Sequence, residues 1–295
     1  MPEKVTNCPL CEREHFTIFD QRDFRGFEVT NVLCSNCGLV FQTPRMTASD
    51  LEDFYQDQYR LAYQGQEGPN EKDLRIQKAR AENLVKFMQE LGVEEIDRYM
   101  DIGSSTGLLM EEIQNAFDCQ VVGIEPGAAY REFARGKGLE VYEDLNQIAA
   151  KEEDRFDLVS MIHVLEHISD PVGYLIRLRE KYLTKSAKLL IEVPNLYAHD
   201  SFELAHLTSF SRETLTQVLK KAGYGTVFIE RHGYPRSKLI PLYITLLAEP
   251  AEVRSDQLRI DLERWVRMKR RAGFLHRRVI ERFIPNYGWV PEYRA

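Results

Sequence analysis

Long apolar runs and disulfide-type cysteine patterns are missing from this sequence. No stretch among its 295 residues approaches the roughly 18 uninterrupted apolar residues that a membrane-spanning helix needs. Residues 1–10 lack the apolar centre of a secretory signal peptide. Only five cysteines are present, and four of them form two closely spaced pairs rather than a disulfide framework. We therefore expect no membrane span and a cytoplasmic location.

A strong positive charge is also lacking. The net charge of −7 argues against nucleic acid as the main partner, although the charge is unevenly distributed. Residues 251–295 contain eleven Lys or Arg but only six Asp or Glu. A chain of this length can bury one full core and carry a small appendage. The composition thus predicts one main domain with additions, and it predicts no particular oligomeric state.

The paired cysteines near the N-terminus indicate a metal site. Cys8 and Cys11 form one CxxC pair, and Cys34 and Cys37 form a second, with short strand-like runs between them. Two such pairs offer four thiolates to a tetrahedral Zn²⁺, and a segment this short has no core to fold without the metal. Because a four-cysteine site leaves no open position for chemistry, we expect the zinc to be structural. Cys119 stands alone and is expected to be a small buried hydrophobe.

Composition divides the chain into four segments. Residues 1–45 hold the cysteine pairs and are interpreted as a zinc ribbon, and residues 46–72 are polar and are interpreted as a linker. Residues 73–250 are expected to form the main domain, and residues 251–295 a basic helical extension. Three linker tyrosines are candidates for a lid over a cofactor or for packing on the zinc ribbon: Tyr55, Tyr59 and Tyr63.

The main domain alternates between helical and strand patterns. A helix is predicted where apolar residues recur at helical spacing from Leu84 to Leu91, and Gly92 ends it. Another is predicted to begin at Pro171 with Asp170 as its cap. Near-continuous apolar strands between helices indicate a parallel sheet covered on both faces, here with an antiparallel edge. The expected strands are "RYMDI", "CQVVGIE", "LEVY", "FDLVSMI", "AKLLIEVP", "GYGTVFIERHG" and "LYITLLAE".

A glycine turn follows the first of these strands in "YMDIGSSTGLLMEEI". Gly103 and Gly107 do not match the dinucleotide pattern G-x-G-x-x-G, because the residue two after Gly103 is a serine. Glu125 ends the next strand, where an acid can accept hydrogen bonds from both ribose hydroxyls. A pyrophosphate is disfavoured by Asp101 and by the absence of a nearby Lys or Arg. The pattern therefore predicts a nucleoside ligand without phosphates.

Several ordered motifs resemble one enzyme family. The match runs from Cys8 to about residue 248, and its motifs are "DIGSSTG", "GIEP", "FDLVSMIHVLEHISDP", "IEVPN" and "HLTSFSRETLTQVLKKAGY". Together they are similar to class I S-adenosylmethionine (SAM)-dependent methyltransferases, in the branch with an N-terminal four-cysteine zinc ribbon that often modifies sugars or natural products. The resemblance implies a doubly wound, seven-stranded Rossmann-like α/β sheet with SAM across the strand ends.

The same resemblance implies roles for individual residues. Asp101, Gly103, Ser104 and Gly107 would line the methionine part of SAM. Glu125 would hold the ribose, with Pro126 beside it. Asp144 and Leu145 would lie by the adenine, and the segment from Met161 to His163 would border the sulfonium.

Methyl transfer needs alignment and a proton acceptor. Displacement at the sulfonium consumes a positive charge, so the protein chiefly aligns donor and acceptor and removes the acceptor's proton. Histidine titrates near neutral pH and suits this task.

His206 is the first candidate for the base, because the matching histidine of sugar-modifying relatives faces the acceptor. The alternative is that His206 only closes the active-site loop by hydrogen bonding. His167 is the second candidate, and His163 is expected beside the cofactor. His163 and His167, four residues apart with Glu166 beside them, could share a helix face, but no third metal ligand is evident.

The sequence departs from the family at one position. Ala205 precedes His206 where the sugar-modifying relatives carry Glu, so a buried carboxylate partner is expected to be missing. The chain also lacks the large C-terminal domain of carbon-methylating sugar enzymes. Both differences favour transfer to oxygen over transfer to carbon.

Five arginines in the C-terminal extension recur at helical spacing: Arg264, Arg267, Arg271, Arg278 and Arg282. They share one helix face if Gly273 does not break the helix. That face is either solvated or turned toward an acidic acceptor or partner.

The sequence thus favours a methyltransferase that acts on a hydroxyl of a small molecule, such as a nucleotide-linked sugar, a glycan end or a natural product. A zinc-containing binding protein or an RNA-directed methyltransferase that uses the basic tail is the alternative. An NAD-dependent dehydrogenase is a third interpretation, and the missing third glycine argues against it.

Overall fold

A computed structural model describes residues 2–47, 50, 68–148, 151–251 and 260–290. Tyr55, Tyr59 and Tyr63, the tyrosines of the predicted lid, lie outside the described residues. Among the described helices, none combines the length and the apolar character needed to cross a membrane.

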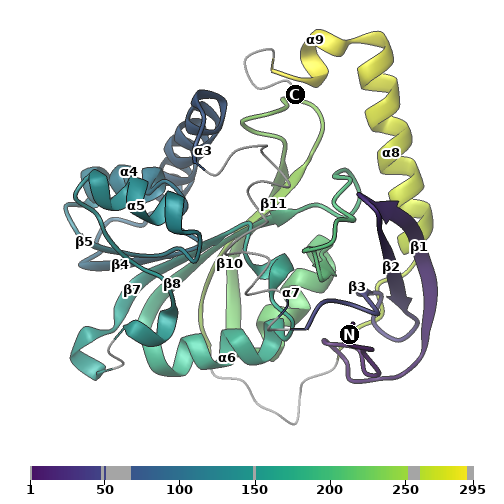
Figure 1. The fold of residues 1–295 in the computed structure, drawn as a ribbon, viewed down its shortest axis with the longest axis horizontal. Coiled ribbons are helices and arrows are strands. Elements are labelled where there is room, and N and C mark those ends of the chain that lie inside the picture. Colours follow the sequence, from purple (N-terminus) through teal and green to yellow (C-terminus); the bar gives the residue numbers. More distant parts are fainter. Residues whose placement is uncertain (1, 48–49, 51–67, 149–150, 252–259, 291–295) are drawn as a thin grey trace.

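A mixed seven-stranded sheet forms the centre of the molecule (Figure 1). Its strand order is β10-β11-β8-β7-β4-β5-β6. The strands from β8 to β6 pair in parallel, whereas β11 pairs antiparallel with both β8 and β10. The sequence prediction of a parallel sheet with an antiparallel edge is confirmed. The strands are β4 (Arg98–Ile102), β5 (Gln120–Ile124), β6 (Glu140–Tyr142), β7 (Phe156–Ile162), β8 (Leu183–Pro194), β10 (Tyr224–His232) and β11 (Tyr243–Pro250).

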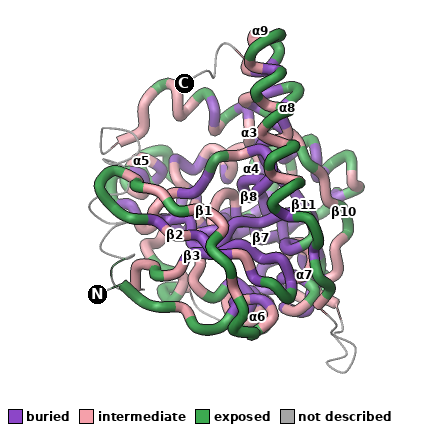
Figure 2. The backbone as a smooth tube through the Cα atoms, turned by 90° about the vertical axis from the view of Figure 1, so that its right-hand side faces the viewer, coloured by how far each residue is buried: buried purple, intermediate pink, exposed green. Residues whose placement is uncertain are grey.

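Helices cover both faces of this sheet, and one hydrophobic core lies under each layer. On one face, α3 (Glu71–Glu90), α4 (Leu108–Phe117) and α5 (Ala128–Gly136) pack on side chains such as Tyr99 and Leu158. On the other face lie α6 (Pro171–Tyr182) and α7 (Arg212–Lys221). Figure 2 shows β7, β8 and β11 as largely buried between these layers. The arrangement is the predicted doubly wound Rossmann-like fold.

Local signals explain where two of the helices end or begin. Leu84, Val85, Phe87 and Met88 face the core, and α3 ends just before Leu91, as predicted. The Asp170 side chain accepts a hydrogen bond from the Gly173 backbone N–H (2.9 Å), so Asp170 is the predicted cap of α6. Cys119 is buried in the core under α3 and α4, which confirms its predicted packing role.

The N-terminal residues form a second, small sheet with the order β1-β2-β3-β9. Its strands are β1 (Phe16–Phe24), β2 (Phe27–Cys34), β3 (Val40–Gln42) and β9 (Thr208–Ser209). The first three belong to the cysteine-bearing segment, whereas β9 belongs to the main domain. Leu10, Leu39 and Phe41 are buried in the same core as α6 and α7. The N-terminal module is therefore built into the main domain.

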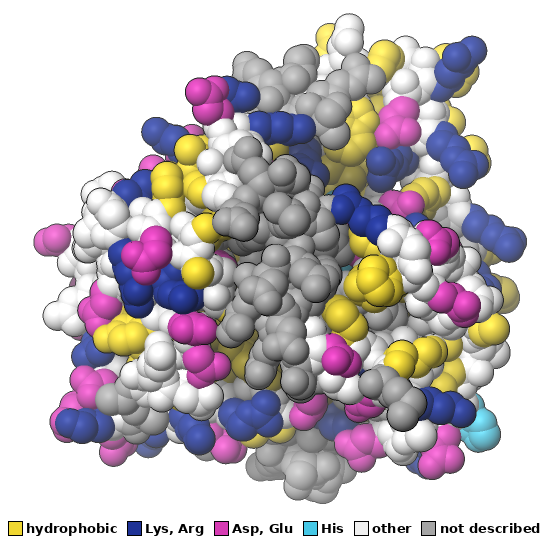
Figure 3. Space-filling model, in the orientation of Figure 1, with side chains coloured by type: hydrophobic (Ala, Val, Ile, Leu, Met, Phe, Trp, Pro, Cys, Tyr) yellow, Lys and Arg dark blue, Asp and Glu magenta, His cyan; other side chains and the backbone are white. Residues whose placement is uncertain are grey.

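The C-terminal helix α8 (Val266–Phe283) begins beside the small sheet, where Arg267 donates to the Ile18 and Phe19 carbonyls of β1, and extends away from it to α9 (Pro285–Gly288) (Figure 1). Gly273 lies within α8 and does not break it; a Cβ there would lie 1.9 Å from the Tyr197 carbonyl oxygen. The five predicted arginines are all exposed, although Arg264 precedes the helix. In Figure 3 basic side chains stand out along the edge where Figure 1 places α8.

Candidate active site

A cleft of about 980 Å³ lies at the carboxyl ends of β4, β5 and β7. This is where ligands bind in doubly wound folds. Eight of the ten sequence-predicted cofactor residues line it: Asp101, Gly103, Ser104, Glu125, Pro126, Asp144, Leu145 and His163. Both candidate bases, His167 and His206, line the same cleft. The structure therefore brings the predicted cofactor and acceptor residues together.

Two predicted cofactor residues, Gly107 and Met161, do not line the cleft. Met161 is fully buried in the core on the α6 and α7 side of the sheet, whereas its neighbours Ile162 and His163 reach the cleft. Gly107 has φ +75°, and a Cβ there would lie 2.3 Å from Leu139. Gly107 therefore allows the start of α4 to lie close to Leu139, and it does not present its backbone to the cleft.

The glycine turn after β4 has the conformation that its sequence requires. Gly103 has φ +78°, which a residue with a side chain rarely adopts, and a Cβ there would lie 2.5 Å from the Val164 side chain. The backbone N–H groups of Gly103 and Ser104 both donate to the Ile124 carbonyl (2.8 and 2.9 Å). These bonds hold the turn against the end of β5, next to Glu125.

Glu125 is buried and held by backbone donors. One carboxylate oxygen accepts from the Ser105 N–H and the other from the Gly127 N–H, both at 2.9 Å. A carboxylate offers about four lone-pair sites, so each oxygen retains the capacity to accept a ribose hydroxyl. The two backbone bonds fix the orientation of the carboxylate toward the cleft.

Asp101 lies at the floor of the cleft and is only 3% exposed. The Ser160 hydroxyl donates to its Oδ1 at 2.5 Å. Burial raises the pKa of Asp101 to about 7, because removal from water disfavours the charged form more than the Ser160 bond favours it. Asp101 therefore changes charge near neutral pH.

His163 contacts two buried carboxylates and is therefore poorly suited to be a base. Its Nε2 lies 3.2 Å from Glu192 and its Nδ1 lies 3.3 Å from Glu166. Burial and Arg80 oppose its protonation, but the two carboxylates outweigh them and raise the pKa of His163. A protonated imidazole has no lone pair to offer. His163 precedes a short 3₁₀ turn, η4 (Leu165–His167), so the helix face predicted for His163 and His167 does not form.

Glu192 forms a buried ion-pair centre that the sequence analysis missed. It is fully buried, and its Oε1 lies 2.8 Å from Arg80 Nε while its Oε2 accepts from the Thr245 hydroxyl (2.8 Å). Burial favours the neutral acid, yet Arg80 and His163 outweigh it and hold the pKa of Glu192 well below its usual range. Arg80 is on α3, so no local sequence pattern links it to β8.

His167 and His206 form an edge-to-face pair with ring centroids 4.7 Å apart. The Nδ1–H of His167 donates to the Ala205 carbonyl, and that of His206 donates to the Ser201 carbonyl, both at 2.8 Å. Because carbonyl oxygens only accept, these contacts place a proton on Nδ1 of both rings, so in the neutral form of each ring the lone pair is on Nε2. Burial, followed by the nearby His206, lowers the pKa of His167 to about 4.

A buried carboxylate lies beside this pair, contrary to the expectation drawn from Ala205. Glu166 is 2% exposed, and ligand atoms of Glu166, His167 and His206 all lie within 4.8 Å of one another. Burial favours the neutral acid, but His163, His167 and His206 outweigh it and lower the pKa of Glu166. Glu166 belongs to the turn η4, whereas the sugar-modifying relatives carry their Glu directly before the matching histidine. The third potential metal ligand beside Glu166 and His167 is likewise present, namely His206.

The N-terminal module holds the His206 segment in place. The side-chain amide of Gln42 donates to the carbonyls of Glu203 (2.8 Å) and His206 (3.2 Å), and the Gln42 backbone N–H donates to the Leu207 carbonyl (2.9 Å). Gln42 is 1% exposed, so these bonds are shielded from water. Strand pairing continues them, with Phe41 opposite Thr208. Nothing in the local sequence around Gln42 signals this role.

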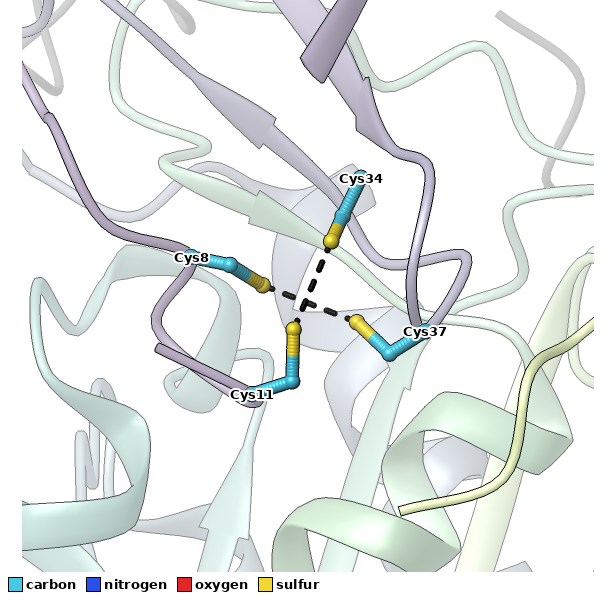
Figure 4. A group of neighbouring side chains, drawn as sticks. All are labelled: Cys8, Cys11, Cys34 and Cys37. Carbon is cyan, nitrogen blue, oxygen red and sulfur yellow. Dashed lines mark hydrogen bonds between the residues drawn. The ribbon is translucent and has the colours of Figure 1, made fainter. Parts of the chain in front are cut away.

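The four N-terminal cysteines converge in the described structure (Figure 4). The Cys8 and Cys37 sulfurs lie 3.6 Å apart, and those of Cys11 and Cys34 lie 3.5 Å apart. In a tetrahedral zinc site with Zn–S bonds of about 2.3 Å, sulfurs are about 3.8 Å apart. The cluster fits a four-thiolate zinc site, with no geometric change beyond a few tenths of an ångström.

A family model described as "Methyltransferase domain" matches residues 70–227, more than half of the chain. This chain belongs to the methyltransferase domain family. The matched range covers α3, the cleft strands and the three cleft histidines His163, His167 and His206. The family assignment replaces the alternative of an NAD-dependent dehydrogenase. No curated protein matches the chain.

Solved structures support the methyltransferase fold. One similar structure is the Burkholderia thailandensis 1,6-didemethyltoxoflavin-N1-methyltransferase, solved with 1,6-didemethyltoxoflavin and S-adenosylhomocysteine. Its sequence is 14% identical to this chain, and the TM-score is 0.57. The match covers 79% of this chain and 100% of that one. The plantazolicin methyltransferase in complex with SAH is 12% identical with a TM-score of 0.52, over 68% of this chain and 94% of that one. At such identities the likeness concerns the fold alone.

Proposed function

We propose that this protein transfers a methyl group from SAM to a hydroxyl of a small-molecule acceptor. The observation that carries the proposal is the composition of one cleft. It is lined by a glycine turn and by the buried acid Glu125, which is placed to bind a ribose, and also by two imidazoles, His167 and His206. Donor and acceptor would therefore meet between β4 and β7.

The proposed cofactor contacts follow the cleft lining. Glu125 accepts the two ribose hydroxyls while its backbone bonds keep it oriented. Asp101, Gly103 and Ser104 lie along the methionine part. Pro126 flanks the ribose, and Asp144 and Leu145 border the adenine, where Asp144 caps the short turn η2 (Leu145–Gln147).

The proposed reaction is an in-line displacement. The acceptor oxygen forms a bond to the methyl carbon, the sulfonium S–CH₃ bond breaks, and its electrons stay on sulfur as neutral S-adenosylhomocysteine. The hydroxyl proton passes to Nε2 of His206, the nitrogen that carries a lone pair in this tautomer. His167, beside it, is the second proton acceptor.

Oxygen, rather than amine nitrogen, is the acceptor atom that this arrangement supports. A neutral amine attacks through its own lone pair and needs no proton acceptor before transfer, whereas a hydroxyl gains from one. Imidazoles beside a buried carboxylate are suited to that step. Because Glu166 supplies the carboxylate that Ala205 does not, the residue at position 205 no longer argues against transfer to carbon.

An anionic acceptor, such as a nucleotide-linked sugar, is supported by Arg236. This residue lines the cleft, and its Nε is buried without a hydrogen-bond partner among the described residues. A guanidinium is the group that binds phosphate oxygens in a fork. The exposed arginines of α8 keep an RNA acceptor as the second candidate, to be separated by the salt dependence of binding.

The four cysteines are proposed to hold one structural Zn²⁺. Their sulfurs converge at distances close to those of a tetrahedral site. Three of them, Cys8, Cys34 and Cys37, are in the core shared with α6 and α7. The metal supplies cross-linking and no open coordination position, so no step of methyl transfer passes through it.

The proposal is tested by incubating the purified protein with methyl-labelled SAM and pools of hydroxylated acceptors, including nucleotide-linked sugars, amines and short RNAs. We expect label on an oxygen of a small molecule, identified by mass spectrometry. Transfer only to nitrogen or only to RNA would reject the acceptor class. A protein that does not bind SAM at millimolar concentration would reject the function.

A further inference from the structure

Three side chains beside the cleft converge as metal ligands do. Glu166 and His167 come from the turn η4 after β7, and His206 comes from the loop before β9. One ligand atom of each lies within 4.8 Å of the others. The four cysteines form a separate cluster, so this group is a second and chemically different one.

Both imidazoles are oriented by backbone carbonyls. In His167 and His206 alike, Nδ1–H donates to a main-chain oxygen at 2.8 Å, which fixes the tautomer with the lone pair on Nε2. Metal-bound histidines almost always donate their other ring N–H in this way. The Gln42 amide further anchors the carbonyl of His206. The rings are therefore held as ligands before any ion binds.

The Glu166 carboxylate has unmet bonding capacity. The residue is 2% exposed, and neither oxygen has a hydrogen-bond partner among the described residues. The nearest basic group on the described side chains is His163, whose Nδ1 lies 3.3 Å from Glu166 Oε1. A carboxylate offers about four lone-pair sites, so Glu166 keeps the capacity to bind a metal ion beside this contact.

We propose that Glu166, His167 and His206 bind one divalent first-row metal ion at the acceptor side of the cleft. Two imidazoles and one carboxylate suit Mn²⁺, Fe²⁺ or Zn²⁺ and leave further coordination positions open. The acceptor hydroxyl is the group in the cleft that such positions would take. This inference rests on the proposed function and deepens it.

A bound cation changes the role of His206. The same Nε2 lone pair cannot bind a metal ion and a proton at once. A metal ion held by Glu166, His167 and His206 would lower the pKa of the acceptor hydroxyl, and the hydroxyl proton would then leave to water. In the metal-free protein His206 takes the proton itself.

The test uses Mn²⁺, because thiolates disfavour this hard ion and the cysteine cluster does not compete for it. Zinc-loaded protein with all four cysteines intact is titrated with Mn²⁺, and free Mn²⁺ is measured by electron paramagnetic resonance. We expect one saturable site per chain. Glu166→Gln, which keeps the size and removes the charge, and His206→Ala should each weaken binding by about tenfold or more, the range known for loss of groups at metal sites.

The control variant is His276→Ala, which removes an exposed histidine on α8 and should leave Mn²⁺ affinity unchanged. SAM binding by each variant reports whether the cleft is still folded. Absence of saturable Mn²⁺ binding, or equal affinity in wild type, Glu166→Gln and His206→Ala, overturns the inference. SAM binding and methyl transfer without Mn²⁺ binding would overturn the metal site alone, whereas Mn²⁺ binding without SAM binding would overturn the proposed function alone.

Discussion

The side-chain amide of Gln42 donates a hydrogen bond to the main-chain carbonyl of His206, 3.2 Å away. Gln42 ends the last strand of the cysteine-bearing module, and His206 lies in the main domain. The contact couples the N-terminal module to the acceptor side of the cleft. A module usually regarded as a separate appendage is therefore part of the support of the active site.

Removing this support should impair catalysis more than cofactor binding. In Gln42→Ala the His206 loop loses two side-chain hydrogen bonds, each worth about 1 kcal/mol. A displaced catalytic group slows turnover, and we expect kcat to fall about tenfold with little change in the affinity for SAM. Gln42→Glu keeps the size but loses both donors, so it should behave like Gln42→Ala. Equal kcat in wild type and both variants would show that the contact is dispensable.

The cysteine cluster should contain about one zinc per chain by elemental analysis. Since three of the cysteines lie in the core shared with α6 and α7, removing the metal should lower the melting temperature of the main domain as well. Cys11→Ser, at the more exposed position, is expected to reproduce the loss. A preparation that is fully folded and active without zinc would contradict this expectation.

In protein without a divalent ion at the acceptor side, His206→Ala should lower turnover by about a hundredfold or more, as expected for loss of a general base. SAM affinity should stay the same, because His206 lies on the acceptor side. His276→Ala is the matched control, since His276 is exposed on α8. If turnover of His206→Ala equals that of wild type, His167 becomes the first candidate for the base.

SAM affinity should depend on pH through Asp101. Burial raises the pKa of this acid to about 7, so it is mostly neutral at pH 6 and mostly ionised at pH 8. The ionised form attracts the positive charges of SAM, and affinity should therefore rise several-fold, up to about tenfold, between these pH values. Calorimetric titration at both pH values measures the change. Asp101→Asn should remove this pH dependence. If the affinity of the variant for SAM still changes with pH, another group causes the change.

Much of the fold could be predicted because its signals are local. The apolar strands, the glycine turn at Gly103 and the cap at Asp170 depend on neighbours in the sequence. The face of a buried strand is harder to predict. β7 is apolar almost throughout, so no alternation of polar and apolar residues distinguishes the core side chain of Met161 from Ile162, which lines the cleft.

The acceptor side of the cleft was predicted only in part, because it is assembled from distant segments. His206 and the turn that carries Glu166 and His167 are far apart in the chain, and they meet where His167 donates to the Ala205 carbonyl. Arg80 of α3 and Glu192 of β8 are likewise distant in the sequence and form an ion pair in the fold. One sequence carries no pairing signal for such contacts, and so the carboxylate beside His206 was expected to be missing.

The central claim is that SAM occupies the cleft with its ribose held by Glu125, and one calorimetric comparison tests it most directly. Wild type, Glu125→Ala and the exposed control Glu132→Ala are titrated with SAM. We predict saturable binding by wild type and by Glu132→Ala, and binding weakened by about tenfold or more in Glu125→Ala, because hydrogen bonds to a charged acceptor contribute about 1.5–3 kcal/mol. Equal affinity in all three proteins, or no binding by wild type, would contradict the account.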